Sequence, residues 1–267
     1  MPLAAGIYYY FTQDGFYETP PVVLLHGAGG MHLFWPPQIR RLPGCRVFTL
    51  DLPGHGKSDQ GGGLQTIDSY ADQVLDWMEA VKLHRAVLIG HSMGGAVALS
   101  VGIRHPERVL GLVLISTGVH LNVPPEVLAD AASPTTFHKA VDNLVSWSFS
   151  SFASERLVEL AANRMREVRP SVLHGDLMAC TGVDYTEHLG DVQPPVLILC
   201  GSDDRLTPVR YSQFMAGVIP GAALEIIPNT GHMVLQEAPE AVGQALAAFL
   251  KKIPYHAGEE NWNVPGN

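Results

Sequence analysis

A strand that must turn sharply into a helix at a serine is the feature that most limits how this chain can fold. Residues 90–94 have the sequence Gly-His-Ser-Met-Gly, and the aliphatic residues 86–89 before them predict a buried strand. Helix-forming residues follow from Met93 on. A serine at such a turn has a strained backbone, and the flanking glycines leave room for close packing. The pattern is typical of a nucleophile elbow, which makes Ser92 the predicted nucleophile.

Apolar strands and helices alternate on both sides of this turn. Strands are expected at residues 6–12, 22–26, 46–50, 86–89, 109–115, 196–200 and 223–227. Helices are expected at residues 67–81, 93–104, 211–218 and 239–251. Alternation of this kind implies parallel strands joined by right-handed crossovers. The sequence therefore predicts an α/β fold with a doubly wound, mostly parallel sheet, formed by residues 1–117 and 193–253.

The middle of the chain interrupts this alternation, because residues 118–192 contain no convincing strand. Helices are expected there near residues 125–132, 135–149, 154–168 and 171–180. An insert of this length is too long for an ordinary connection. We therefore expect a helical cap over the carboxyl ends of the strands. The polar residues 254–267 are expected to form a loose C-terminal tail.

The charge balance disfavours two classes of partner. Lys and Arg number 17 against 26 Asp and Glu, which gives a net charge of −9 with neutral histidines. Nucleic acids and anionic membranes both require a basic surface, so neither is an expected partner. No apolar run approaches the ~20 residues of a membrane span, and residues 1–10 lack the pattern of a signal peptide.

Cysteine and histidine occur without the spacing of a metal site. Cys45, Cys180 and Cys200 are far apart and outside any C-x-x-C pair, which favours buried free thiols in a reducing cytoplasm. The 12 histidines are scattered and form no H-E-x-x-H pattern. We therefore expect a cytoplasmic protein without a catalytic metal.

A serine hydroxyl needs a base within hydrogen-bond reach and a group that orients this base. After a nucleophile elbow, the acid and then the histidine follow along the chain. His232 lies between the last predicted strand and the last helix and is the candidate base. Asp204 and its neighbour Asp203 both follow a buried strand, so either carboxylate would emerge at the strand's carboxyl end. His91, although adjacent to Ser92, points elsewhere at a tight turn and is expected to pack.

The glycine-rich loop 26–30, with the sequence His-Gly-Ala-Gly-Gly, follows another buried strand. Negative charge that builds on a carbonyl oxygen during attack needs preorganised donors. The backbone N–H of Met93, at the start of a helix, is one candidate. The N–H of Ala28 is the second and that of Gly29 the fallback, because small residues let the backbone approach a substrate. Such a loop can also hold phosphate, but it has neither G-x-G-x-x-G nor a Walker lysine, which disfavours a nucleotide.

These motifs together resemble the α/β-hydrolase superfamily, over nearly the whole chain. The resemblance rests on the following segments and residues: 26–29, the sequence Asp-Leu-Pro-Gly-His-Gly-Lys-Ser at 51–58, the turn at Ser92, Asp204 and the pair 231–232. It implies that 51–58 is a structural loop without a catalytic role. Similar proteins commonly show D-x-x-x-P after the strand, and this register selects Asp204 over Asp203 as the acid.

The resemblance further implies a carboxylesterase-like enzyme that needs no cofactor. Ser92 would attack a small-molecule ester of small to medium size and largely apolar character, and His232, held by Asp204, would act as the base. Hydrolysis of a carbon–carbon bond in a diketone, or of a lactone, on the same triad is the alternative. A non-catalytic ligand receptor is a remote alternative, since some proteins with this fold only bind.

The cap is the expected source of specificity, and its low charge disfavours a strongly anionic substrate. Large apolar residues of the cap, and two just after the glycine-rich loop, are the candidate substrate-binding residues. They are Phe34, Trp35, Phe137, Trp147, Phe149, Phe152, Met165 and Met178.

Overall fold

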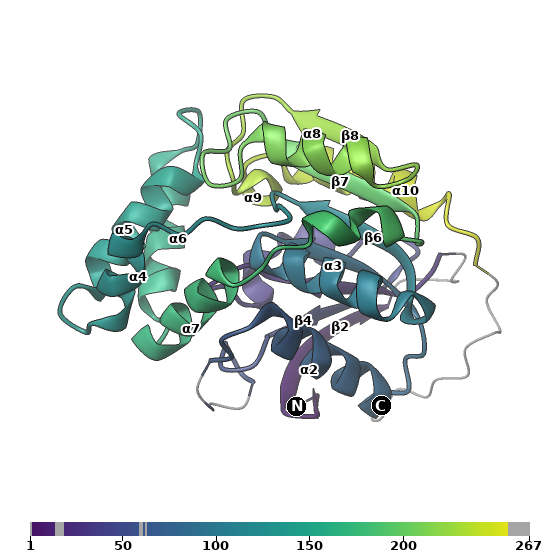
Figure 1. Ribbon diagram of the computed structural model, residues 1–267, viewed down its shortest axis with the longest axis horizontal. Helices are drawn as coiled ribbons and strands as arrows, with labels where there is room; N and C mark the ends of the chain where they lie inside the picture. The colour runs from purple at the N-terminus through teal and green to yellow at the C-terminus, as the bar shows by residue number, and fades with distance from the viewer. Residues whose placement is uncertain (1, 14–18, 59–60, 62, 256–267) are drawn as a thin grey trace.

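The structure, a computed structural model, describes residues 2–13, 19–58, 61 and 63–255 of the chain. In this part, eight strands form one sheet with the spatial order β1-β2-β4-β3-β5-β6-β7-β8 (Figure 1). The strands are β1 (Leu3–Ala4), β2 (Ile7–Gln13), β3 (Val22–Leu25), β4 (Arg46–Leu50), β5 (Ala86–His91), β6 (Val109–Ile115), β7 (Val196–Gly201) and β8 (Ala223–Ile227). The pairs β1–β2 and β2–β4 are antiparallel, and all other neighbours are parallel. The predicted mostly parallel sheet is thus confirmed.

One edge of the sheet differs from the prediction. The strand expected at residues 6–12 corresponds to β2, but β1 lies outside it and forms the edge. Ala5 and Gly6 have φ values of 46° and 75°, and this two-residue turn folds β1 back onto β2. A paired segment of two residues is too short to produce a periodic pattern, so the sequence could not reveal it.

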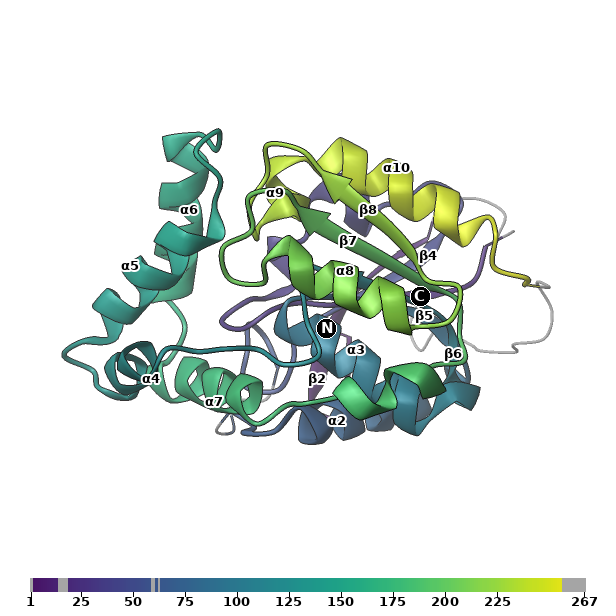
Figure 2. The ribbon, with the colours of Figure 1, turned by 45° about the horizontal axis from the view of Figure 1, so that its top comes forward.

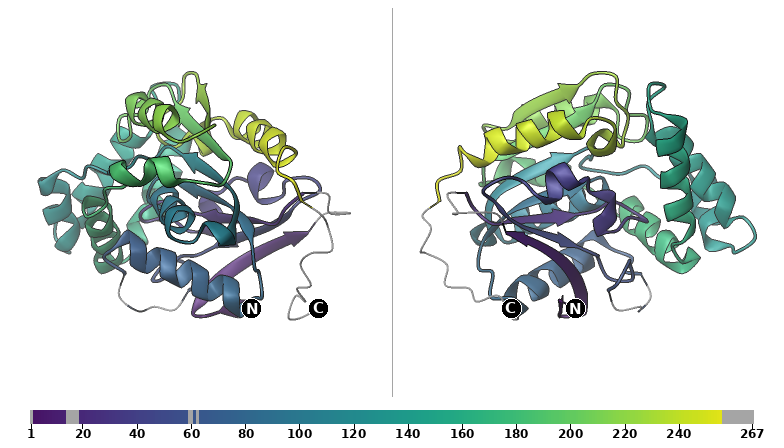
Figure 3. Two further views of the ribbon diagram at one scale, coloured as in Figure 1. Left: turned by 45° about the vertical axis from the view of Figure 1, so that its right-hand side comes forward. Right: turned by 180° about the vertical axis from the view of Figure 1, so that it is seen from behind.

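Helices cover both faces of the sheet, as Figures 1 and 3 show. On one face pack α2 (Ile67–Ala80), α3 (Met93–Arg104) and α8 (Val209–Val218), and on the other α1 (Pro37–Arg40) and α10 (Pro239–Leu250). The shorter elements are α9 (Val234–Glu237) and the 3-10 turns η1 (His32–Phe34), η2 (Pro106–Arg108) and η3 (Thr186–Asp191). Side chains of each strand alternate between the two layers, so that Val23 and Leu24 belong to different apolar clusters.

Four helices follow β6 along the chain and precede β7. In space they lie beside the carboxyl ends of the parallel strands (Figure 2). These inserted helices, as we call them below, are α4 (Pro125–Ala132), α5 (Phe137–Ser148), α6 (Glu155–Arg166) and α7 (Pro170–Thr181). Their apolar sides form a third cluster that also includes Phe34 and Met233. The domain boundaries at 118 and 192 stay a prediction. The predicted tail 254–267 lies, from residue 256 on, outside the described residues.

Local signals in the sequence explain where several helices begin. The hydroxyl of Thr66 accepts the N–H of Ser69 at 3.1 Å before α2, and the hydroxyl of Ser154 accepts the N–H of Leu157 at 3.3 Å before α6. Proline occupies the first position of α4, α7 and α10, where its missing N–H costs nothing. In the described part of the chain, no helix has both the length and the apolar character needed to cross a membrane.

Candidate active site

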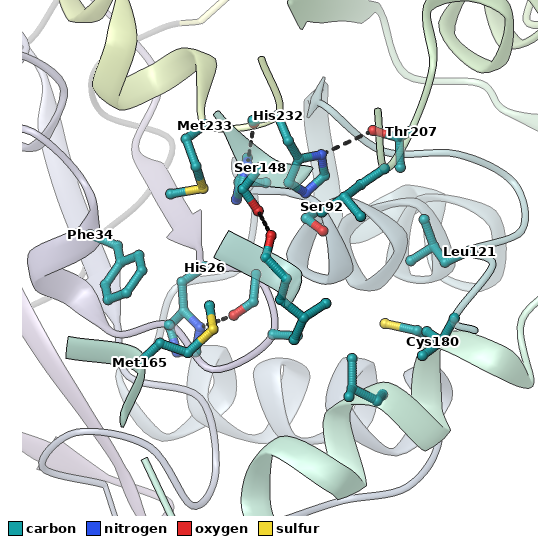
Figure 4. A pocket seen from close by; sticks show the side chains of 18 of the residues that line it. His26, Phe34, Ser92, Leu121, Ser148, Met165, Cys180, Thr207, His232 and Met233 are labelled. Atoms are coloured by element: carbon teal, nitrogen blue, oxygen red, sulfur yellow. Dashed lines mark hydrogen bonds between the residues drawn. The ribbon is translucent and has the colours of Figure 1, made fainter. Parts of the chain in front are cut away.

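Ser92 lies between β5 and α3 with φ 53° and ψ −119°, a backbone conformation that side chains rarely adopt. Its N–H donates to the carbonyl of Ile115 at 2.9 Å, so the neighbouring strand supports the turn. The turn requires both glycines. A Cβ on Gly90 would lie 2.0 Å from the carbonyl oxygen of Gly94, and one on Gly94 would lie 2.2 Å from that of Leu25. This geometry places Ser92 in the lining of a pocket (Figure 4).

Asp204 and His232 form a buried pair beside Ser92. The Nδ1 of His232 lies 3.0 Å from one carboxylate oxygen of Asp204 and 3.1 Å from the other. With its Nδ1–H directed at the carboxylate, the imidazole has Nε2 as its proton-accepting nitrogen. In Figure 4 the ring lies next to Ser92, and both residues line the pocket. The structure therefore brings together the three residues that the sequence singles out.

The loop around Asp204 keeps its carboxylate charged. Burial alone would raise the pKa of Asp204, but the charge of His232 and the hydrogen bonds from His232 and Thr207 outweigh it. They lower the pKa from 3.8 to about 2. The hydroxyl of Thr207 donates to Asp204 at 2.8 Å, and the N–H groups of Leu206 and Thr207 donate at 2.9 and 2.8 Å. Thr207 is a member of the site for which sequence reasoning found no signal.

His91 does more than the packing that the sequence predicts. Its Nε2 lies 2.9 Å from the backbone carbonyl of His232, and the two ring centroids are 5.0 Å apart. Burial, and secondly the proximity of His232, lower the pKa of His91 from 6.5 to about 3. The neutral ring therefore donates its Nε2–H to this carbonyl. His91 thus holds the loop that carries the candidate base, through a contact between residues 141 positions apart.

Replacing His91 by glutamine is expected to reduce the acid sensitivity of the fold. Between pH 6.5 and about 3, only the unfolded chain protonates this histidine, so the free energy of unfolding falls as the pH falls. The expected contribution is about 1.4 kcal/mol per pH unit. Urea unfolding from pH 7 to pH 4 should therefore show a shallower slope for His91→Gln. The exposed His138 of α5 offers the matched control, and an equal change of slope in His138→Gln would contradict the assignment.

The glycine-rich loop lies directly against the elbow. A Cβ on Gly27 would be only 3.1 Å from the Cβ of Ser92. The carbonyl of Gly27 accepts the Nδ1–H of His26 at 2.8 Å and the N–H of Gly30 at 3.0 Å. The Nε2 of His26 in turn accepts the N–H of Leu52 at 3.0 Å. This pattern requires a neutral His26, and burial is the main cause that lowers the pKa of His26 from 6.5 to about 4.

One backbone donor of this loop is already engaged. The N–H of Gly29 donates to the carboxylate of Asp176 at 2.8 Å, and Asp176 belongs to the inserted helix α7. Ala28 lies between Gly29 and Gly27, and Gly27 packs closely against Ser92. Met93 is the first residue of α3. We therefore keep the N–H groups of Ala28 and Met93 as the proposed oxyanion donors.

The pocket is apolar on both sides of the serine. In the view of Figure 4, Phe34 and Met165 lie to one side of Ser92, and Leu121 and Cys180 lie to the other. The apolar lining comprises Ala28, Phe34, Trp35, Leu121, Val123, Pro124, Leu144, Met165, Leu177, Cys180, Leu206, Met233 and Leu235. Among the described residues that line the pocket, none is Asp, Glu, Lys or Arg. An uncharged apolar molecule fits this lining best.

The candidate substrate-binding residues divide into two groups. Phe34, Trp35 and Met165 line the pocket. The others lie outside its lining, and they are Phe137, Trp147, Phe149, Phe152 and Met178. Phe137 is buried among the inserted helices, whereas Phe152 is 69% exposed. Helical spacing shows which residues share a face, but tertiary packing decides which face meets the pocket. The lining residues Leu144 and Leu177 carry no signal that distinguishes them from ordinary core leucines.

The inserted helices are hydrogen-bonded to the loop of the candidate acid. Arg205 follows Asp204 directly, and its guanidinium donates to the carbonyls of Ser146 and Phe149 at 3.1 and 2.9 Å. These carbonyls lie at the C-terminal end of α5, where a cation also opposes the helix dipole favourably. The end of α5 is therefore tied to the acid loop.

The loop of the candidate base has a similar connection. Glu237 accepts the N–H of Gly231 at 2.9 Å with one oxygen and the hydroxyl of Ser150 at 2.6 Å with the other. The N–H of Met233 donates to the carbonyl of Ser148 at 3.0 Å. The segment after α5 and the histidine loop thus share the carboxylate of Glu237, for which no sequence pattern offered a signal.

Several known proteins are similar to this chain in sequence or in fold. A pimeloyl-[acyl-carrier protein] methyl ester esterase from Aromatoleum aromaticum is 31% identical over 247 residues, which cover 84% of this chain and 95% of that protein. A thermophilic esterase from Thermogutta terrifontis matches with a TM-score of 0.82 and 25% identity, over 92% of this chain and 93% of the other. An enol-lactonase from Burkholderia xenovorans LB400 shares the fold, with a TM-score of 0.86 and 24% identity, over 94% and 100%.

Residues 20–239 match the family model described as the alpha/beta hydrolase fold. The chain therefore belongs to the α/β hydrolase fold family. The family and these relatives support a hydrolase, as the sequence motifs predict.

Proposed function

We propose that this protein is a serine hydrolase that cleaves carboxylic esters of small to medium, largely apolar molecules. One observation carries the proposal. Ser92, on a strained elbow, and His232 line the same apolar pocket, and the Nδ1 of His232 is hydrogen-bonded to the carboxylate of Asp204. The charged Asp204 orients the imidazole and stabilises its protonated form during the reaction.

The proposed reaction has two halves. In the first, the Oγ of Ser92 attacks the ester carbonyl while its proton passes to the Nε2 of His232, and this proton then goes to the departing alcohol. An acyl group remains bound to Ser92. In the second half, His232 takes a proton from water, the resulting hydroxide attacks the acyl group, and the carboxylic acid leaves as the proton returns to Ser92. The N–H groups of Ala28 and Met93 are the proposed donors to the oxyanion in both halves.

A series of p-nitrophenyl esters of increasing acyl length is the direct test of this function. Turnover that is greatest at one chain length would support an esterase and would indicate the length of acyl chain that its pocket accepts. A folded protein that hydrolyses no ester of the series would contradict the proposal.

A carboxylate at the far end of the acyl chain should sharply reduce turnover. We expect kcat/KM for mono-p-nitrophenyl adipate to be about a hundredfold below that for p-nitrophenyl hexanoate, because the pocket lining has no cation to compensate a buried charge. The two esters have six-carbon acyl chains and the same leaving group, so they differ only at the far end, where a carboxylate replaces a methyl group. Equal kcat/KM values would show that the acyl chain lies in solvent and not among these apolar side chains.

Lactone hydrolysis is the second candidate, since a lactone is a cyclic ester that the same groups could open. The similarity in fold to an enol-lactonase is the observation in its favour. An apolar lactone with a ring of similar size to the preferred ester separates the two functions. Faster turnover of the lactone would favour this candidate over an open-chain ester.

A further inference from the structure

A buried carboxylate joins the inserted helices to the glycine-rich loop. Asp176 lies in α7 and is fully buried. One of its oxygens accepts the N–H of Gly29 at 2.8 Å and the Nε2–H of His55 at 2.8 Å. The other accepts the hydroxyl of Tyr70, from α2, at 2.5 Å. Four segments that are distant in the sequence therefore meet at this one side chain.

The apolar packing around α7 gives no reason for a charge at this position. The neighbours of Asp176 on the helix, Leu173 and Leu177 among them, are buried and apolar. Replacing a buried ionic group by apolar side chains of similar volume is often neutral or stabilising, so a buried ion pair is weak evidence for a role in stability. Asp176 also acts on its partner: burial would lower the pKa of His55, but the charge and hydrogen bond of Asp176 outweigh this and raise the pKa of His55.

The position of Asp176 matters because it orients a peptide unit next to Ser92. In a trans peptide the C=O and the N–H point in opposite directions, so fixing one fixes the other. His26 and Gly30 hold the carbonyl of Gly27 and thereby direct the N–H of Ala28. Asp176 holds the N–H of Gly29 and thereby fixes the next peptide plane. The Gly27–Ala28 peptide, which carries the Ala28 donor, is thus held at its own carbonyl and, through the following peptide, by Asp176.

We propose that Asp176 is a positioning residue, which holds the glycine-rich loop so that the N–H of Ala28 meets the oxyanion. This inference rests on the proposed function. Asp176 acts through Gly29 and touches no reacting atom. The oxyanion exists in the transition state and not in the bound substrate, so a misplaced donor lowers kcat and leaves KM nearly unchanged.

The test compares Asp176→Ala and Asp176→Asn with the wild type on the best p-nitrophenyl ester. For Asp176→Ala we expect kcat to fall about tenfold to a hundredfold, with KM within about threefold. Affinity for a boronic acid with the same acyl chain, which forms a tetrahedral adduct on the serine, should fall by a similar factor. Asp176→Asn keeps an oxygen that can accept the N–H of Gly29, so it should recover part of kcat.

Tyr70→Phe is the matched control, because it removes one hydrogen bond to the same carboxylate and leaves Gly29 untouched. Its kcat should stay within about twofold of the wild type. An unchanged kcat in Asp176→Ala, or an equal loss in Tyr70→Phe, would overturn the inference. If Asp176→Ala does not fold, the kcat and the boronic acid affinity of Asp176→Asn become the test. Wild-type values for both would contradict the positioning role of Asp176. A wild type that neither hydrolyses esters nor reacts with a fluorophosphonate would instead refute the proposed function.

Discussion

Ester hydrolysis should fall about a millionfold when Ser92 is replaced by alanine. The variant loses the atom that forms the acyl-enzyme, while the elbow and the His232–Asp204 pair remain. Alanine has no hydroxyl but otherwise fits the site of serine, so the fold should be retained. The measurement is kcat/KM on the best p-nitrophenyl ester, together with a thermal melt of the variant.

Ser100→Ala provides the control for losing a buried serine hydroxyl. Ser100 lies on the same helix α3, and its hydroxyl donates to Asp68 at 2.7 Å. We expect its kcat/KM to stay within about twofold of the wild type. Turnover that persists in Ser92→Ala would place the chemistry elsewhere. Absence of turnover in the wild type, with retained binding of apolar ligands, would favour the receptor alternative.

The second large effect is expected for Asp204→Asn, which should lower kcat about ten thousandfold. An amide in place of the carboxylate can present an N–H to the Nδ1 of His232, which favours the tautomer with its proton on Nε2. That tautomer cannot accept the proton of Ser92. The N–H groups of Leu206 and Thr207 can still donate to the remaining oxygen, so the loop should keep its shape. Steady-state kinetics and circular dichroism test the two expectations together.

Asp203→Asn is the matched control at the adjacent position. The side chain of Asp203 is exposed, and it accepts the hydroxyl of Ser202 at 2.8 Å. This substitution should leave kcat within about twofold of the wild type. If Asp203→Asn lost activity and Asp204→Asn did not, the assignment of the acid would be refuted.

Much of the fold could be predicted from the sequence, because buried parallel strands and amphipathic helices leave strong local patterns. The strands that surround Ser92 are continuous apolar runs, and β5 and β6 lie where those runs predict them. The glycines of the elbow are equally informative, since no other residue fits at Gly90 or Gly94. A family resemblance then selected Asp204 over Asp203, which residue chemistry alone left open.

The contacts that position the site were beyond such reasoning. His91 is hydrogen-bonded to the carbonyl of His232, which lies 141 residues away in the sequence. Asp176 is hydrogen-bonded to the N–H of Gly29, which lies 147 residues away. Both depend on how whole elements pack, which no local pattern encodes. One signal was present for Asp176, an acidic residue within a largely apolar helix. The orientation of the inserted helices was hidden for the same reason, as Phe137 of α5 shows, which is buried but does not line the pocket.

The hydrogen bonds of Arg205 and Glu237 have a consequence for protein engineering. One way to change the specificity of this chain would be to exchange the segment between β6 and β7 for another. In this chain the inserted segment is not an independent module, since Arg205 in the loop of the acid and Glu237 at the end of α9 both bind it. A chimera that replaces residues 118–192 alone would lose the hydrogen bond from the hydroxyl of Ser150 to Glu237, and it would keep the contacts of Arg205 only if it placed backbone carbonyls at the same positions. A working graft must bring matching partners for these two side chains and a carboxylate in the place of Asp176, whose own partners Gly29, His55 and Tyr70 remain in the rest of the chain.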